Sequence, residues 1–242
     1  MSLPPDDRSK FVVFIVEAPS DLDLFVRRTE SEIIQRFVEL SNMPCVSNTA
    51  ISSRVLTECL LTKLPQTMAQ YPGHIPVLHI SAHGNSEGIQ LSMDDFLEWT
   101  QLREILKVVN KRLGGHLVLC MSSCEGYSAI RMAMYPEETE FPYFVLVGCG
   151  STPTWSETTL GYQAFYHHLL NRGENIFVAA DHMRSASGNH YFWLEHAEKT
   201  REFYIEFLRP KPTQMPNDLL ALQPANTLLA LSELARLRGE SE

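Results

Sequence analysis

The sequence lacks the clusters of lysine and arginine that proteins use to bind nucleic acids or anionic membranes. Its 242 residues include 20 Lys and Arg against 29 Asp and Glu, which gives a formal net charge of −9 at pH 7. Binding to phosphate-rich partners depends on clustered basic side chains. We therefore expect no direct binding to nucleic acid and none to membranes.

Long apolar runs and a disulfide pattern are also missing. No apolar stretch is long enough to cross a bilayer, and the first residues have neither the basic start nor the apolar core of a secretory signal. The cysteines are odd in number and irregularly spaced, unlike those of a disulfide framework: Cys45, Cys59, Cys120, Cys124 and Cys149. These features predict free thiols in a reducing, cytoplasmic compartment.

The chain alternates apolar runs with segments of helical periodicity. Runs of β-branched and aromatic residues are typical of buried strands, and they occur at 11–16, 75–80, 116–121 and 143–148. Apolar residues recur at helical spacing at 22–40, 54–63, 96–113, 158–170 and 191–207. Between them, 47–53 is typical of a polar turn, and 176–180 fits a short strand or a helix. The alternation predicts an α/β fold with a mostly parallel central sheet between layers of helices.

Three prolines between 210 and 216 mark the only internal boundary that the sequence suggests. We expect one domain at 1–209 and a C-terminal helical tail at 210–242. The Leu- and Ala-rich part of this tail, 219–237, is expected to pack on the domain or on a partner.

Two of the predicted strands run into reactive side chains flanked by small residues: Ser-Ala-His-Gly at 81–84 and Ser-Ser-Cys-Glu-Gly at 122–126. Neighbouring parallel strands place their carboxyl ends at the same edge of a sheet, so we expect His83 and Cys124 to meet there. A histidine beside a cysteine promotes thiolate attack on a carbonyl and can then protonate the leaving amine. The small neighbours leave backbone N–H groups available to an oxyanion, with Gly84 and Cys124 as the natural donors.

These residues also have structural interpretations. Taken alone, Cys124 is typical of a buried thiol at a strand end, and His83 of a hydrogen-bonded histidine. Cys120 and Cys124 could suggest a metal site, but Cys120 lies within the predicted strand and no second ligand pair has zinc-like spacing. His168 and His182 are expected to be surface or packing residues. We therefore favour the Cys–His pair and expect no metal and no cofactor.

The two motifs resemble those of the caspase-like (clan CD) cysteine peptidases, and among these the CHAT domain. CHAT sequences have an aliphatic strand followed by Ser-Ala-Cys-Glu-Thr-Gly, which is similar to Ser-Ser-Cys-Glu-Gly-Tyr at 122–127. Their histidine block resembles the pair at 83–84, and the interval from histidine to cysteine is similar to that of caspases. The resemblance covers roughly residues 11–170. The first two positions of the caspase pentapeptide Gln-Ala-Cys-x-Gly differ, so caspase-like aspartate specificity is not expected.

The resemblance implies a caspase-like three-layer α/β/α sandwich and a cysteine endopeptidase that acts on a protein substrate. Cys124 would be the nucleophile and His83 the general base and acid, without an essential third residue. The backbone amides of Gly84 and Cys124 would bind the oxyanion.

The loop after the strand at 143–148 would then shape the pocket for the residue that precedes the cut. Glu125, Ser151 and Trp155 are candidate substrate-binding residues, with Trp155 as a pocket wall. Glu157, or the acidic pair at 94–95, would give the pocket an acidic base and a preference for Arg or Lys. The alternative for Trp155 is packing, and for Glu157 the first turn of the next helix.

The resemblance also suggests a role in bacterial defence, for example antiviral defence, or in regulated cell death, with an activating protein partner. The alternative from another class is a non-catalytic caspase-like scaffold that binds partners. A third reading is a thiol hydrolase or transferase that uses the same dyad on a small acyl substrate.

Overall fold

The four predicted apolar runs form four adjacent strands in the middle of the central sheet. They are β1 (Phe11–Ala18), β3 (Ile75–Asn85), β6 (Val118–Ser122) and β7 (Val145–Cys149). The order in the sheet is β2-β1-β3-β6-β7-β8, and these four strands are parallel to one another. Every residue of β1, β6 and β7 is buried, as expected where helices cover both faces of a parallel sheet.

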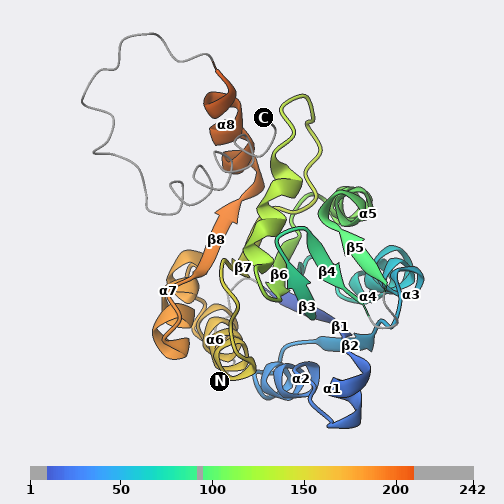
Figure 1. The fold of residues 1–242 in the computed structure, drawn as a ribbon. Helices are drawn as coiled ribbons and strands as arrows, with labels where there is room; N and C mark the ends of the chain where they lie inside the picture. The colour runs from blue at the N-terminus through green and yellow to red at the C-terminus, as the bar shows by residue number, and fades with distance from the viewer. Residues whose placement is uncertain (1–9, 92–94, 210–242) are drawn as a thin grey trace.

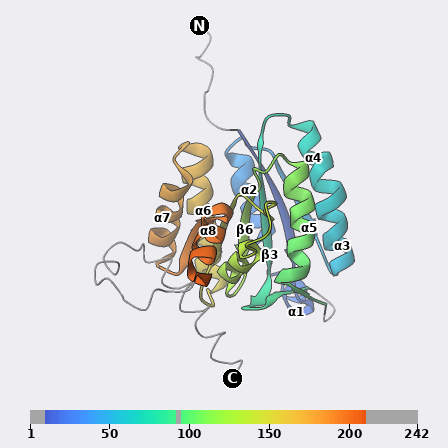
Figure 2. The same cartoon turned by 90° about the horizontal axis from the view of Figure 1, so that it is seen from above.

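The structure is a computed structural model that describes residues 10–91 and 95–209. Figure 2 shows helices on both sides of the sheet. One layer contains α2 (Ser31–Leu40), α6 (Trp155–Tyr166) and α7 (Ile176–Ser187), and the other α3 (Ser53–Glu58), α4 (Leu64–Gln70) and α5 (Trp99–Arg112). Alternate residues of β1 contribute to two separate cores, Phe14 and Val16 to one and Val13 and Ile15 to the other. The predicted three-layer α/β/α sandwich with a mostly parallel sheet is confirmed.

The prediction missed two edge strands of this sheet, β2 (Cys45–Thr49) and β8 (Phe192–His196). β2 pairs with β1, and its short, half-exposed sequence carries little hydrophobic signal, so the predicted turn at 47–53 was wrong at 47–49. β8 is antiparallel to β7 and lies where a helix was predicted at 191–207. Only the second part of that segment is helical, as α8 (Ala197–Leu208). The segment that fitted either a strand or a helix is the start of α7.

Helix boundaries differ from the prediction where the backbone departs from regular α-helix. Arg27 has φ 53° and separates α1 (Asp21–Phe25) from α2, which were predicted as one helix. The helix predicted to stop before Pro65 continues through a π-helical turn, η1 (Cys59–Lys63), into α4. Pro65 is tolerated there because it lies in the first turn of α4.

A small antiparallel sheet extends the molecule beyond the end of β3. It contains β4 (Gly88–Gln90) and β5 (Phe96–Glu98), neither of which was predicted. Consequently α5 begins at Trp99 rather than at 96. The predicted tail at 210–242 and one of the two acids at 94–95, Asp94, lie outside the described residues, so the domain boundary stays a prediction. Within the described residues, no helix has both the length and the apolar character needed to cross a membrane.

Candidate active site

The register between β3 and β6 brings the two sequence motifs together. The parallel pairing runs from Val77 opposite Val118 to Ser81 opposite Ser122. His83 and Cys124 each lie two residues beyond this last pair. The two motif-bearing strands are therefore parallel neighbours, while the meeting of His83 with Cys124 and the catalytic roles of the two residues stay predictions.

β3 does not end at the histidine motif, as the sequence suggested, but continues through it to Asn85. Beyond the parallel sheet it pairs with β4, with His83 opposite Gln90 and Gly84 opposite Ile89. The backbone of Gly84 lies against the cysteine motif: a Cβ atom there would lie 3.1 Å from the Ser123 Cβ and 3.2 Å from the Cys124 carbonyl oxygen. This close approach keeps the two predicted oxyanion donors, Gly84 and Cys124, next to each other.

The turn after Cys124 has a conformation that fixes the start of the following 3-10 helix, η2 (Gly126–Ala133). Glu125 has φ 51° and ψ 26°, and its N–H donates a 2.8 Å hydrogen bond to the carbonyl oxygen of Ser151. A Cβ on Gly126 would lie 2.6 Å from the Met121 carbonyl oxygen, so only glycine fits this position without displacement. This hydrogen bond joins the turn to the loop after β7, which contains the candidate substrate-binding residue Ser151.

Asp23 is the direct partner of His83. His83 Nε2 lies 2.7 Å from Asp23 Oδ2, and the side chain of Asp23 is 4% exposed against 48% for His83. Asp23 also accepts hydrogen bonds from the backbone N–H and the hydroxyl of Ser20 in a capping box at the start of α1. The sequence analysis predicted only the Cys124–His83 pair and no residue bonded to His83. The structure places the Asp23 carboxylate there.

The environments of Asp23 and Cys124 favour opposite protonation states. Burial tends to raise the pKa of Asp23, but hydrogen bonds from Ser20 and His83 outweigh it and lower the pKa. At neutral pH an ionised Asp23 requires the proton of His83 on Nε2, which leaves Nδ1 as the basic nitrogen. Burial raises the pKa of the Cys124 thiol, and the charge of Glu125 raises it further. In this conformation Cys124 is therefore a neutral thiol at pH 7.

Trp155 lies beside the histidine, as the predicted pocket wall would. Its ring is perpendicular to that of His83, with centroids 6.3 Å apart. The Arg28 guanidinium lies 6.0 Å from the Trp155 ring and 3.8 Å from Asp23 Oδ1. An acidic and an aromatic side chain thus lie beside His83, and the basic side chain of Arg28 lies near both of them.

Glu157 lies in the first turn of α6, as the alternative to a pocket role predicted. It is the third residue of α6 and forms a capping box with Thr154, whose N–H lies 2.6 Å and whose hydroxyl lies 2.8 Å from Glu157 Oε2. These hydrogen bonds lower the pKa of Glu157. Its other oxygen lies 3.5 Å from the Asn189 amide. A role for Glu157 at the base of a substrate pocket stays a prediction, as does substrate binding by Glu125 and Ser151.

A buried carboxylate lies beneath the ends of β3 and β6. Glu30 is 1% exposed and accepts hydrogen bonds from the hydroxyls of Ser81 at 2.7 Å and Ser122 at 2.6 Å. His79 Nε2 lies 3.7 Å from the same oxygen, and His79 Nδ1 lies 2.9 Å from the Tyr166 hydroxyl. Burial alone would raise the pKa of Glu30, but His79 and the two serines together lower it. Glu30 thus joins the two strands at the first residue of each motif.

The sequence analysis missed both acids. Asp23 has a recognisable sequence signal, whereas for Glu30 only its two serine partners have one. The spacing Ser20-x-x-Asp23 is that of a capping box before an apolar segment. Ser81 and Ser122 are small polar residues at the ends of apolar strands, which calls for a buried polar partner. Nothing in the sequence identifies that partner as Glu30, since it belongs to a different part of the chain.

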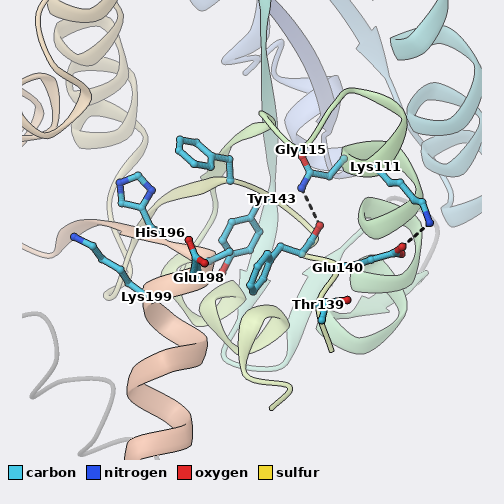
Figure 3. Close-up of a pocket in the computed structure, with 12 residues that line it drawn as sticks. Lys111, Gly115, Thr139, Glu140, Tyr143, His196, Glu198 and Lys199 are labelled. Atoms are coloured by element: carbon cyan, nitrogen blue, oxygen red, sulfur yellow. Dashed lines mark hydrogen bonds and ion pairs between the residues drawn. The ribbon is translucent and has the colours of Figure 1, made fainter. Parts of the chain in front are cut away.

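A pocket of about 490 Å³ lies at the opposite edge of the sheet. Figure 3 shows its lining, which includes Gly115 before β6, Tyr143 before β7, His196 at the end of β8 and Lys199 on α8. None of the predicted site residues lines this pocket. The chemistry of the two motifs and this pocket are therefore separate features of the molecule.

No family model matches the sequence, and no curated protein gives a significant match. Among solved structures, this chain is similar to the caspase drICE, with a TM-score of 0.50, 11% sequence identity and coverage of 80% of this chain and 90% of that one. It is also similar to the Arg-specific cysteine proteinase gingipain R, with a TM-score of 0.45, 8% identity and coverage of 76% of this chain and 45% of that one. The likeness to drICE shows that the chain has a caspase-like fold.

Proposed function

We propose that this chain is a cysteine endopeptidase of the CHAT type that cleaves a protein substrate through an acyl-enzyme on Cys124. The observation that carries the proposal is the placement of His83 and Cys124 at equal distances beyond the paired serines of two adjacent strands. A caspase-like fold and the Asp23 carboxylate on His83 support it. Defence or cell-death signalling and an activating partner remain part of this proposal.

In the proposed reaction, His83 removes the thiol proton as the Cys124 sulfur bonds to the scissile carbonyl carbon. The carbonyl oxygen becomes an oxyanion that the amides of Gly84 and Cys124 stabilise. The C–N bond then breaks, and His83 donates the proton to the leaving amine. Water, deprotonated by His83, hydrolyses the thioester and restores the thiol. Asp23 is a positioning residue that keeps the His83 proton on Nε2.

Because the Cys124 thiol is neutral in this conformation, we expect that binding of a substrate or a partner triggers the reaction. Among the hydrogen bonds of the described residues, none joins Cys124 to His83. Catalytic contacts often tighten only when substrate is bound. We therefore expect the free chain to show slow alkylation of Cys124 at neutral pH, faster as the pH rises.

The test is cleavage of a peptide library prepared from a whole proteome, with new N-termini identified by mass spectrometry. Wild type should produce cleavages that are absent with Cys124→Ala and His83→Ala. Cys45→Ala is the matched control, because Cys45 is the other half-buried thiol and lies on β2. Cleavage that persists in Cys124→Ala would contradict the proposal.

The raised pKa of Cys124 favours one second candidate, a caspase-like scaffold that only binds partners. A scaffold would show no cleavage with any variant, and a peptide-like electrophile would label Cys124 no faster in wild type than in His83→Ala. An endopeptidase would show labelling that depends on His83.

A further inference from the structure

Two histidines and a glutamate converge away from the candidate active site, where α6 gives way to α7. His168 lies in the π-helical turn η3 (His167–Asn171) that extends α6, Glu174 lies in the connection, and His182 lies on α7. His168 Nδ1 is 2.9 Å and His182 Nε2 is 3.6 Å from the same oxygen, Glu174 Oε2. One ligand atom from each residue lies within 4.8 Å of the other two.

The two imidazole rings are stacked rather than scattered over the surface. Their centroids are 3.5 Å apart and their planes differ by 3°. The backbone fixes the glutamate beside them, because the Glu174 N–H donates a 3.0 Å hydrogen bond to the His168 carbonyl oxygen. All three residues are half-buried, with side-chain exposures of 20% for His168, 29% for Glu174 and 45% for His182. The expectation of surface or packing residues at these two positions did not include their shared contact with Glu174.

The types of the three ligand atoms suit a divalent metal. Neutral imidazole nitrogens and one carboxylate oxygen are ligands that zinc prefers. With bonds of about 2.0–2.1 Å, tetrahedral ligand atoms lie roughly 3.3 Å apart. To reach this spacing the side chains would have to rotate, because in the stacked arrangement the two parallel rings cannot both hold one metal in their planes.

We propose that His168 Nδ1, Glu174 and His182 Nε2 form a zinc-binding site, with water as the fourth ligand. The partial exposure of His182 leaves room for that water and for exchange with solvent. The metal would join the end of α6 to α7, which lie side by side in Figures 1 and 2. Because α6 begins at Trp155, which contacts His83, the site would also stiffen the helix that borders the candidate active site.

The test is zinc binding by the full chain, measured by calorimetry and thermal unfolding after treatment with a chelator. All proteins carry Cys124→Ala, so that the thiol of the candidate active site does not contribute. We expect one zinc per chain and a melting temperature raised by roughly 5–10 °C at a hundredfold excess over the dissociation constant. Cobalt should give the visible bands of a tetrahedral site without a thiolate charge-transfer band.

The variants His182→Ala, His182→Gln and Glu174→Gln should each weaken binding at least tenfold. His190→Ala is the matched control, because His190 is an exposed histidine that follows the end of α7. Equal melting temperatures in chelator would show that the variants fold. Binding that is absent from the parent protein, or unchanged in the three variants, would overturn the proposal. Because the parent protein lacks Cys124, the proposed nucleophile, this result is independent of peptidase activity.

Discussion

At the scale of single residues, the candidate active site is set by two carboxylates with different tasks. Asp23 holds one nitrogen of His83, whereas Glu125 lies next to Cys124 and disfavours its thiolate. Asp23 therefore orients His83, while burial and Glu125 together favour the neutral thiol of Cys124.

We expect Asp23→Asn to reduce peptide cleavage by about 10²–10⁴-fold, because an amide no longer requires the His83 proton on Nε2. The matched control is Asp21→Asn, an exposed acid in the same helical turn. The ratio of the kcat values of Asp23→Asn and wild type measures the effect. Equal losses in the two variants would show that α1, and not the carboxylate, is needed.

The substitution Asp23→Asn should also change how the free energy of unfolding depends on pH. The pKa of Asp23 is lowered from 3.8, so its ionised form stabilises the folded state at pH values above 3.8. This contribution is lost as the pH falls through the lower, folded-state pKa. Urea unfolding should therefore show wild type more stable than Asp23→Asn at pH 6, with a difference that shrinks below pH 3.8. A difference that is constant with pH would exclude ionisation as its cause.

Two thiols allow a crossed test of the local charges. The pKa of Cys124 is raised by burial and Glu125, and that of Cys45 is raised to about 12 by burial and Glu39. Removing a negative charge favours the thiolate, so Glu125→Gln should speed iodoacetamide labelling of Cys124 roughly two- to fivefold at a given pH. Glu39→Gln should do the same for Cys45 alone. Peptide mass spectrometry reads both sites, and acceleration at both in either variant would contradict the assignment.

At the scale of elements, the turn between β6 and η2 depends on backbone conformations that few residues adopt. Glu125 is in the left-handed region at φ 51°, where a Cβ atom is strained. Glu125 occupies this position despite the strain. Its N–H donates a hydrogen bond to the carbonyl oxygen of Ser151 and so joins the turn to the loop after β7. Cys124 thus directly precedes a strained residue in the connection between β6 and η2.

We expect Glu125→Gly to leave the free energy of unfolding unchanged or to raise it by up to about 1 kcal/mol, because glycine relieves the left-handed strain. Glu125→Val should lower it by about 1–2 kcal/mol. The helical control is Glu39→Gly, where glycine should cost about 1 kcal/mol. Urea unfolding measures all three, and a destabilising Glu125→Gly would contradict the strain argument.

The sequence predicted the elements that are buried on both sides and missed those at the edges. The four central strands carry continuous apolar runs, whereas β2 and β8 are partly exposed and have weaker patterns. The two motifs could be predicted because each directly follows a central strand. Asp23 and Glu30 could not be assigned to the site, because the contacts that define them join residues far apart in the chain, such as His83 and Asp23 at a separation of 60 residues.

At the scale of the whole molecule, one buried residue, Glu30, joins three strands of the sheet. Glu30 follows β1 and α1 in the chain and bonds to Ser81 of β3 and Ser122 of β6. Its backbone N–H in turn donates to the buried Glu17 of β1. The relative position of the two motif-bearing strands therefore depends on a polar network within an apolar core.

We expect Glu30→Ala to lower the free energy of unfolding by about 2–4 kcal/mol, because the two serine hydroxyls and His79 lose their common partner inside the protein. Glu32→Ala, an exposed acid on the same helix, should change it by less than about 0.5 kcal/mol. Chemical unfolding of both variants measures the difference. A small effect at Glu30 would mean that water replaces the carboxylate.

The pairing of Ser81 with Ser122 also decides when the site can exist. During synthesis the histidine motif is complete well before the cysteine motif, and parallel strands pair only after the intervening helix has formed. Non-local pairing of this kind is slow compared with local helix formation. His83 and Cys124 therefore come to one edge of the sheet only once β3 and β6 have paired, so under the proposed function a copy that lacks this pairing is expected to be inactive.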